Sequence, residues 1–156
     1  MSASSEREDT ARPESPARRT RGSGGSERAA EEGRLIYLAV KAALGLPPRP
    51  ALIVDIGGGS VQLVVGDKDR LHLAAGVPLG ALRLSELLLE SDPPSRGDMT
   101  GLRRTIRRKS ADALAEVMAL KPRRVYGSSG SIHALAQLWH WQAYGTEVPQ
   151  INGYRL

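Results

Sequence analysis

The sequence contains no cysteine and no phenylalanine. Without cysteine the chain can form no disulfide, no thiolate metal site and no cysteine nucleophile. Without phenylalanine, a hydrophobic core has to be built from leucine, valine, isoleucine and alanine. No stretch approaches the roughly 20 apolar residues that a membrane helix needs. Residues 1–32 are polar and lack the apolar segment of a secretory signal, so we expect a cytoplasmic protein with no membrane partner.

The 156 residues favour a single domain, but the composition changes along the chain. Residues 1–28 are rich in Ser, Arg, Glu, Gly and Pro, which predicts a disordered leader because such a segment buries little apolar surface. Residues 29–143 carry the apolar periodicity of a folded domain. Residues 144–156 show no clear pattern and are interpreted as a C-terminal tail.

The net charge of +5 is equalled by one stretch, residues 96–109, which holds six basic residues and one acidic residue. A basic surface favours anionic partners. Within this stretch, the residues at 103, 104, 107 and 108 are arginines, which form either a solvated helix surface or a guide for a polyanion. The arginines near the N-terminus are almost neutralised by neighbouring acidic residues, so we expect no nucleic-acid partner.

Apolar spacing and turn residues predict the order helix, three-strand meander, two helices, strand, helix, which is an α/β or α+β layer arrangement. The short connections between the first three strands require antiparallel pairing. Asp98 or Thr100 is expected to cap the helix that Pro122 stops. The predicted helices start near residues 26, 81, 98 and 132, and the predicted strands are residues 51–56, 62–66, 71–75 and 124–126.

The most informative segment is the turn formed by Gly57, Gly58, Gly59 and Ser60, directly after a strand that ends with Asp55 and Ile56. A glycine turn leaves consecutive backbone N–H groups open to a phosphate. A carboxylate at the end of an apolar strand is costly unless it is hydrogen-bonded or binds a cation such as Mg²⁺. The alternative is a glycine-rich hairpin without a ligand. The spacing matches neither a P-loop nor a dinucleotide fingerprint.

Three other features have two interpretations each. Residues 127–131 form a second small-residue loop before a predicted helix. This loop either binds an anion at the helix N-terminus, or simply caps the helix through Ser129 or Ser131. Glu31 and Glu32 either stabilise a helix start or include a general base that orients water. Arg34 either pairs with a carboxylate or phosphate or is solvated. The two tryptophans, at 139 and 141, are predicted to be core or interface residues.

Together these motifs resemble the exopolyphosphatase and guanosine pentaphosphate phosphatase family, which belongs to the actin-like ATPase superfamily. The resemblance runs from Glu31 to Leu138 and rests on residues 31–37, 54–60, 78–84 and 127–131. It implies an actin-like (ribonuclease H-like) α/β phosphatase fold, of which this chain would be a fragment. It also implies Mg²⁺-dependent hydrolysis of the terminal phosphate of polyphosphate, or of the 5′ phosphate of guanosine pentaphosphate.

By position, the resemblance makes Glu32 the base for the attacking water, Asp55 the residue associated with the metal, and Gly57, Gly58, Gly59 and Ser60 a phosphate-binding loop. The family usually has Glu at the position of Gln62, and that Glu helps to form the metal site.

Family members begin with a subdomain that carries an earlier Asp-x-Gly-Ser-Asn-Ser loop, and nothing in residues 1–30 resembles it. We therefore expect a truncated chain with one half of the phosphate clamp and impaired hydrolysis. The alternatives are a non-catalytic polyphosphate or nucleotide binder, and an interaction module in which a second copy or a separate chain supplies the missing half.

Overall fold

The computed structural model describes residues 18–19 and 26–155. The predicted leader, residues 1–28, lies largely outside these residues, and its last three residues already belong to the first helix. The elements in chain order are β1 (Arg18–Arg19), α1 (Ser26–Leu44), β2 (Ala51–Ile56), β3 (Val61–Gly66), β4 (Leu71–Val77), α2 (Ala81–Leu88), α3 (Arg96–Ala119), β5 (Val125–Ser128) and α4 (Gly130–Tyr144).

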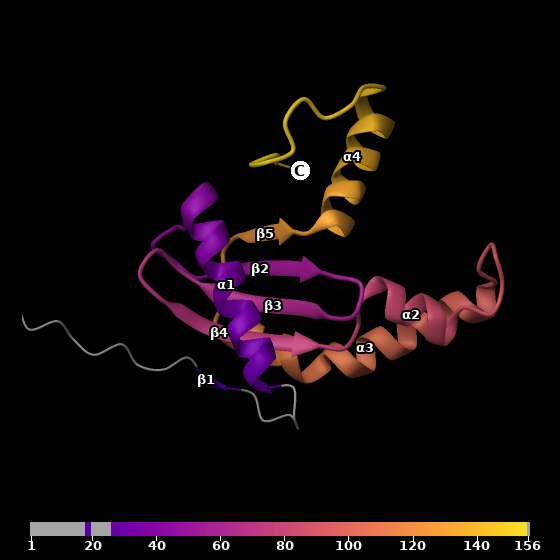
Figure 1. The fold of residues 1–156 in the computed structure, drawn as a ribbon, viewed down its shortest axis with the longest axis horizontal. Helices are drawn as coiled ribbons and strands as arrows, with labels where there is room; N and C mark the ends of the chain where they lie inside the picture. The colour runs from indigo at the N-terminus through magenta and orange to yellow at the C-terminus, as the bar shows by residue number, and fades with distance from the viewer. Residues whose placement is uncertain (1–17, 20–25, 156) are drawn as a thin grey trace, which may run out of the picture.

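A single five-stranded sheet has the strand order β1-β4-β3-β2-β5 (Figure 1). Strands β2, β3 and β4 form the predicted antiparallel meander, with Ile53 opposite Val64 and Val64 opposite Ala74. Strand β5 returns after two helices and pairs in parallel with β2, while the two-residue β1 pairs with β4. The carboxyl ends of β2 and β5 therefore lie at the same end of the sheet.

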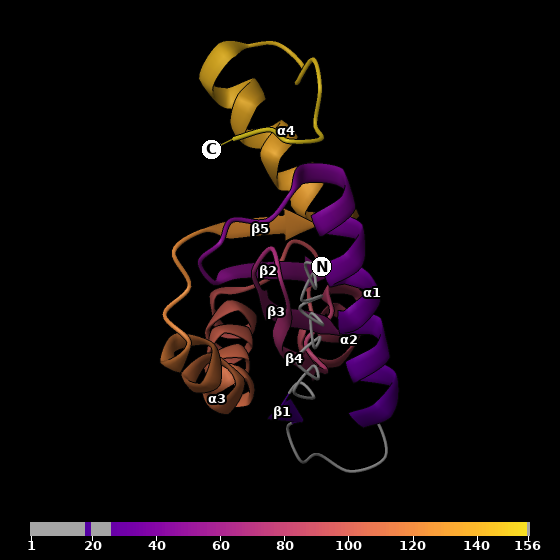
Figure 2. The same cartoon turned by 90° about the vertical axis from the view of Figure 1, so that its left-hand side faces the viewer.

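Helices cover both faces of the sheet: Figure 2 shows α1 on one side and α3 on the other. On the α1 face, Tyr37 packs with Ile53 and Val64. On the α3 face, Val117 packs with Val65 and Leu73. Because β3 is covered from both sides, its residues from Gln62 onward are buried, as expected for the centre of a three-layer α/β arrangement.

The start of α3 differs from the prediction. Ser95, and neither Asp98 nor Thr100, is the N-cap: its side chain accepts a hydrogen bond from the Asp98 backbone N–H. Asp98 stands at the third helical position and accepts a hydrogen bond from the Ser95 backbone N–H at 2.9 Å, which completes a capping box. The helix therefore begins earlier than expected, because two short side chains satisfy each other's backbone.

Two other boundaries were also placed too conservatively. Strand β4 continues to Val77, two residues beyond the predicted strand 71–75, because its pairing with β3 extends to Val61. Helix α4 is longer than predicted, from Gly130 to Tyr144. Its two tryptophans, Trp139 and Trp141, are 44% and 56% exposed, so they are not core residues.

Within residues 18–19 and 26–155, no helix is both long enough and apolar enough to span a membrane.

Candidate functional site

The glycine turn (residues 57–60) connects β2 to β3 beside the start of α2 (Figure 1). Its first three carbonyl oxygens all accept hydrogen bonds from α2. The Ala81 N–H donates to Gly57 O at 3.0 Å, and the Arg83 N–H donates to Gly58 O at 3.0 Å. The Arg83 side chain donates from Nε to Gly59 O at 3.1 Å. Three consecutive peptide groups of the turn are thus held in one orientation by one helix.

This orientation determines where the amides of the turn point. In a trans peptide the C=O of one residue and the N–H of the next point in opposite directions, so the N–H groups of Gly58, Gly59 and Ser60 point away from α2. None of the three donates a hydrogen bond to any residue that the structure describes. Such a row of open amides is the anion-binding geometry that the glycine turn predicts.

The glycines of the turn leave space for a ligand to reach the amides, and they are not needed for an unusual backbone conformation. Their φ angles are not positive. A Cβ added at Gly59 would meet no atom within 4 Å, and one at Gly58 would make only ordinary contact with Leu82. Gly80 is different, because its Cβ would lie 2.3 Å from Gly58 O. Close approach between α2 and the turn therefore requires glycine at position 80.

Asp55 and Glu32 are both neighbours of Gln62. Asp55 pairs directly with Gln62 across the β2–β3 ladder, and directly opposed residues place their side chains on the same face of a sheet. From α1, the carboxylate of Glu32 accepts a hydrogen bond from Gln62 Nε2 to Oε2 at 2.7 Å. The sequence placed Glu32 and Asp55 in different elements, and Gln62 brings them to one face.

Gln62 itself is buried, with 2% exposure, and its Oε1 has no hydrogen-bond partner among the described residues. The Gln62 side chain packs directly against Gly76 of β4. A Cβ added at Gly76 would lie only 2.9 Å from Gln62 Oε1 and 2.8 Å from Ala29 Cβ, so the space around the amide is narrow. A buried amide in so narrow a space has little freedom to rotate. Its Nε2 therefore orients the Glu32 carboxylate.

The two neighbouring glutamates have different environments. Glu31 forms a two-pronged ion pair with Arg34, with both N–O distances 2.9 Å, on the exposed surface. The hydrogen bond from Arg34 lowers the pKa of Glu31. Of the two interpretations of Arg34, pairing with a carboxylate is confirmed. Glu31 is thus engaged by Arg34, whereas Glu32 is held by Gln62 at the sheet end.

The second small-residue loop lies next to the first. Ser128 pairs with Asp55 in the parallel β2–β5 ladder. The hydroxyl of Ser129 donates to Ile56 O at 2.8 Å and accepts from Ile56 N–H at 3.2 Å. Ser129 is the residue before α4, but its side chain makes no capping bond, so capping by Ser129 is wrong. Its φ of +85° is rare for a residue with a side chain, and such strain often accompanies functional sites.

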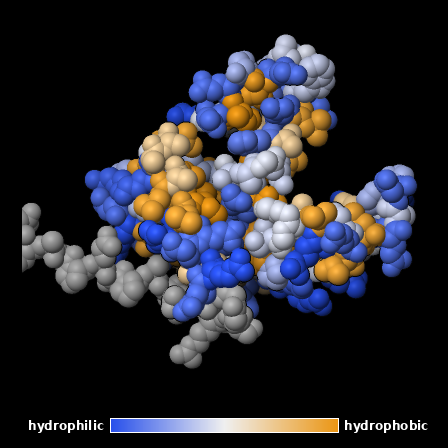
Figure 3. Space-filling view, viewed as in Figure 1, coloured by the Kyte–Doolittle hydropathy of each residue, from blue (hydrophilic) through white to orange (hydrophobic). Residues whose placement is uncertain are grey.

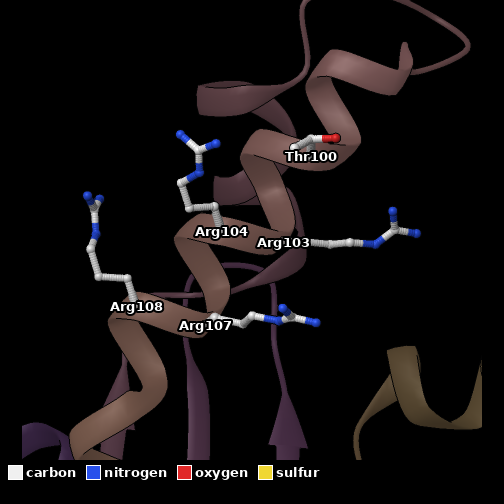
Figure 4. A pocket seen from close by; sticks show the side chains of 5 residues that line it. All are labelled: Thr100, Arg103, Arg104, Arg107 and Arg108. Atoms are coloured by element: carbon white, nitrogen blue, oxygen red, sulfur yellow. The ribbon is translucent and has the colours of Figure 1, made fainter.

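The predicted basic surface is an open depression on α3, which we call the basic face (Arg103, Arg104, Arg107 and Arg108), together with Thr100. Figure 4 shows Arg104 and Arg108 projecting to one side of the helix and Arg103 and Arg107 to the other. Helix α3 covers the sheet face opposite to α1, so the basic face and Glu32 belong to different sides of the molecule.

The donors near the glycine turn fit a metal only if phosphate helps to bind it. In the part of the chain that the structure describes, no three His, Cys, Asp or Glu side chains form a group that could hold an ion. Magnesium commonly takes one or two carboxylates and completes its shell with water and substrate phosphate. Asp55 provides one such carboxylate, and Gln62 opposite it adds no charge.

Sequence reasoning missed three residues of this site. Gly80 and Arg83 lie inside a motif already noticed, residues 78–84, but nothing in their types revealed their contacts with the glycine turn. Ser129 was considered as a helix cap and as part of a possible anion-binding loop, but its hydrogen bonds with Ile56 were not predicted. Each acts through a partner more than 20 residues away in the sequence, at Gly58, Gly59 or Ile56.

A mixed sheet covered on both faces, with two loops at the carboxyl ends of parallel neighbours β2 and β5, defines an α/β protein with a candidate ligand site at a strand end. The Ppx/GppA phosphatase family model matches residues 28–153, and the chain belongs to this family. The resemblance found in the sequence is therefore confirmed.

Curated relatives and solved structures agree with this assignment. Exopolyphosphatase 2 of Mycobacterium tuberculosis is 32% identical over 109 residues, 70% of this chain and 34% of that protein. Exopolyphosphatase 1 of Mycobacterium leprae is 36% identical over 112 residues, 71% of this chain and 33% of that protein. The chain thus spans about a third of the length of these relatives.

An exopolyphosphatase structure from Cytophaga hutchinsonii matches with a TM-score of 0.67 and 22% identity, over 77% of this chain and 38% of that chain. A Ppx/GppA phosphatase structure from Aquifex aeolicus matches with a TM-score of 0.60 and 28% identity, over 78% of this chain and 38% of that chain. The predicted α/β fold of the actin-like ATPase type is confirmed by these neighbours.

Proposed function

We propose that this chain provides one phosphate-binding half of an exopolyphosphatase-type site, which removes the terminal phosphate of polyphosphate or of guanosine pentaphosphate. The observation that carries the proposal is the row of open amides at Gly58, Gly59 and Ser60. This row follows the strand that carries Asp55, and Gln62 links the end of that strand to Glu32. Family membership supports the same chemistry.

In this proposal Glu32 orients and deprotonates the water that attacks the terminal phosphorus. One of its carboxylate oxygens accepts the Gln62 hydrogen bond, which leaves the other for water on an exposed surface. The open amides hold the oxygens of the terminal phosphate, where negative charge is concentrated during phosphoryl transfer. The new bond joins the water oxygen to phosphorus, and the bridging oxygen leaves with the shortened chain.

We also propose Mg²⁺ as the cofactor, held by Asp55 together with oxygens of the substrate phosphate. The bound ion would neutralise phosphate charge. Because Gln62 replaces a carboxylate that the family usually has, we expect metal affinity to depend on phosphate. A cytoplasmic location also remains our proposal.

The test combines binding with turnover. Tripolyphosphate with Mg²⁺ should shift the backbone NMR signals of Gly58, Gly59 and Ser60. Release of phosphate from long-chain polyphosphate by the purified chain should be weak, because one of the two phosphate-binding halves alone positions the substrate poorly. Glu32→Gln should abolish any residual release, and Glu31→Gln, the matched control, should not. Rapid turnover by the purified chain would contradict the expected impairment, and unchanged signals in the glycine turn would contradict the site.

A second candidate function is a non-catalytic polyphosphate or nucleotide binder, favoured by the basic face. Changing its four arginines to glutamine would then abolish binding and its salt dependence, with no phosphate release at any stage. Signal shifts confined to residues 100–108 would favour this candidate over the first.

We further propose that a second α/β half, from another copy or a separate chain, completes the site. The support is apolar side chains without cover: Leu135, Leu138 and Trp141 of α4 are 59%, 55% and 56% exposed, and Val125 of the edge strand β5 is 66% exposed. Figure 3 shows apolar surface over α4 and over part of α1. Analytical sedimentation of the purified chain, alone and mixed with a candidate partner chain, tests this proposal. A chain that sediments as a monomer alone and in every mixture would contradict it.

A further inference from the structure

The side chain of Arg83 has an unusual relation to the glycine turn. Its Nε donates to Gly59 O at 3.1 Å, although the side chain is exposed and forms no ion pair with any described residue. The other two carbonyls of the turn, at Gly57 and Gly58, are held by backbone N–H groups of α2. Arg83 is therefore the side chain that completes the anchoring of the turn to α2.

The direction of this bond determines what Arg83 can do. The carbonyl of Gly59 and the N–H of Ser60 belong to one trans peptide, so they point in opposite directions. A guanidinium on the carbonyl side of that peptide stands on the side away from an anion bound by the Ser60 N–H. Arg83 thus acts on such an anion through the peptide rather than by direct contact.

We propose that Arg83 is a positioning residue: it fixes the Gly59–Ser60 peptide so that the last of the three open amides faces the phosphate. This inference rests on the proposed function for its ligand, but its structural part, the order of the peptide, does not. The first two peptides of the turn are fixed by the backbone of α2, whereas the third depends on one side chain, so its order can be changed by a single substitution.

The experiment compares Arg83→Met, Arg83→Lys and Arg123→Met in the full chain. Arg83→Met keeps most of the aliphatic stem and removes the donor, Arg83→Lys keeps charge and a donor, and Arg123→Met removes the same charge from an exposed residue between α3 and β5. The ¹⁵N order parameter of Ser60 should fall from about 0.85 to below about 0.6 in Arg83→Met, whereas that of Gly59 should change little, because the Arg83 backbone N–H still holds the Gly58 carbonyl. The Ser60 value should be unchanged in Arg123→Met and largely restored in Arg83→Lys.

Tripolyphosphate with Mg²⁺ should bind about tenfold more weakly to Arg83→Met than to Arg123→Met, with melting temperatures equal within experimental error. Equal order parameters in Arg83→Met and the unmodified chain would overturn the inference. If tripolyphosphate does not bind the unmodified chain, the proposed function fails, and the order parameters alone still decide whether Arg83 holds the peptide.

Discussion

The glycine turn joins β2 to β3, and the aspartate turn (residues 67–70) joins β3 to β4 at the opposite end of the sheet. Both connect antiparallel neighbours, and each has an aspartate at or near its start. In the aspartate turn, Asp67 Oδ1 accepts from the N–H groups of Asp69 and Arg70 at 2.8 and 2.9 Å. In the glycine turn, no side chain among the residues that the structure describes accepts from the N–H groups of Gly58, Gly59 or Ser60.

The rest of the aspartate turn is equally well satisfied. Asp67 Oδ2 lies 2.7 Å from His72 Nε2, and the Asp67 carbonyl accepts from the Tyr37 hydroxyl at 2.9 Å. The Lys68 N–H donates to Pro47 O at 2.9 Å. This turn uses its backbone groups for its own stability and leaves little for a ligand.

The difference shows what separates a structural turn from a candidate binding turn. In the aspartate turn, a carboxylate occupies the position that an external anion would take. In the glycine turn, the carbonyls are held from outside by α2, so the amides are ordered without an internal acceptor. Open amides that are already oriented can bind an anion without the cost of ordering the loop.

Gly80→Ala should give the largest effect. Its Cβ would lie 2.3 Å from Gly58 O, so α2 has to separate from the glycine turn. We expect a loss of roughly 3 kcal/mol in the free energy of unfolding, together with loss of tripolyphosphate binding. Urea unfolding measures the first. Gly101→Ala, where the new Cβ meets nothing within 4 Å, is the control and should be neutral or stabilising. Equal behaviour of the two variants would show that α2 does not need this close approach.

Asp67→Ala should have a smaller effect, confined to stability. Two backbone N–H groups and His72 lose their acceptor, which should cost roughly 2 kcal/mol and leave tripolyphosphate binding unchanged. Asp69→Ala is the control, because the Asp69 carboxylate is exposed and accepts no hydrogen bond from the backbone of any described residue. Impaired anion binding in Asp67→Ala would contradict the assignment of separate roles to the two turns.

The same variant has a defined pH dependence. Burial raises the pKa of Asp67, but hydrogen bonds from the Arg70 backbone, His72 and the Asp69 backbone outweigh it, so the pKa falls below its usual value of 3.8. A lowered folded-state pKa means that stabilisation is present above the unfolded pKa and is lost as pH falls through the folded one. The stability difference between the unmodified chain and Asp67→Ala should therefore be constant near neutrality and shrink below pH 3.8. A difference that grows in acid would reverse this sign.

Ser129→Ala should have the smallest effect of the three. It removes both hydrogen bonds with Ile56, directly before the glycine turn, and we expect roughly 1 kcal/mol of lost stability with a modest weakening of anion binding. Ser131→Ala serves as the control, because Ser131 lies in the first turn of α4 and its side chain forms no hydrogen bond with any described residue. If the two serine variants bind tripolyphosphate equally well, the second loop does not support the first.

Much of the fold was predictable because it depends on neighbours in sequence. The meander follows from three apolar strands joined by connections too short for a crossover. Helix α3 ends at Ala119, shortly before Pro122, which was expected to stop it. The predicted cap of α3 was wrong because Ser95 and Asp98 act as a pair, whereas Asp98 was considered alone and Ser95 was not considered. The site was predictable in residue type at Asp55, Glu32 and residues 57–60, but their roles remain proposals.

The sequence by itself determined the family, the meander and the glycine turn, since these depend on local patterns of residue type and spacing. Only the tertiary structure decided that Gln62 holds Glu32, that Ser129 bridges the two loops, and that Gly80 and Arg83 orient the turn. These contacts join residues 21 to 73 positions apart. Such pairs come into contact only when β5 pairs with β2 and the helices pack against the sheet. A local sequence pattern cannot predict these contacts, because it reflects only residues close together in the chain.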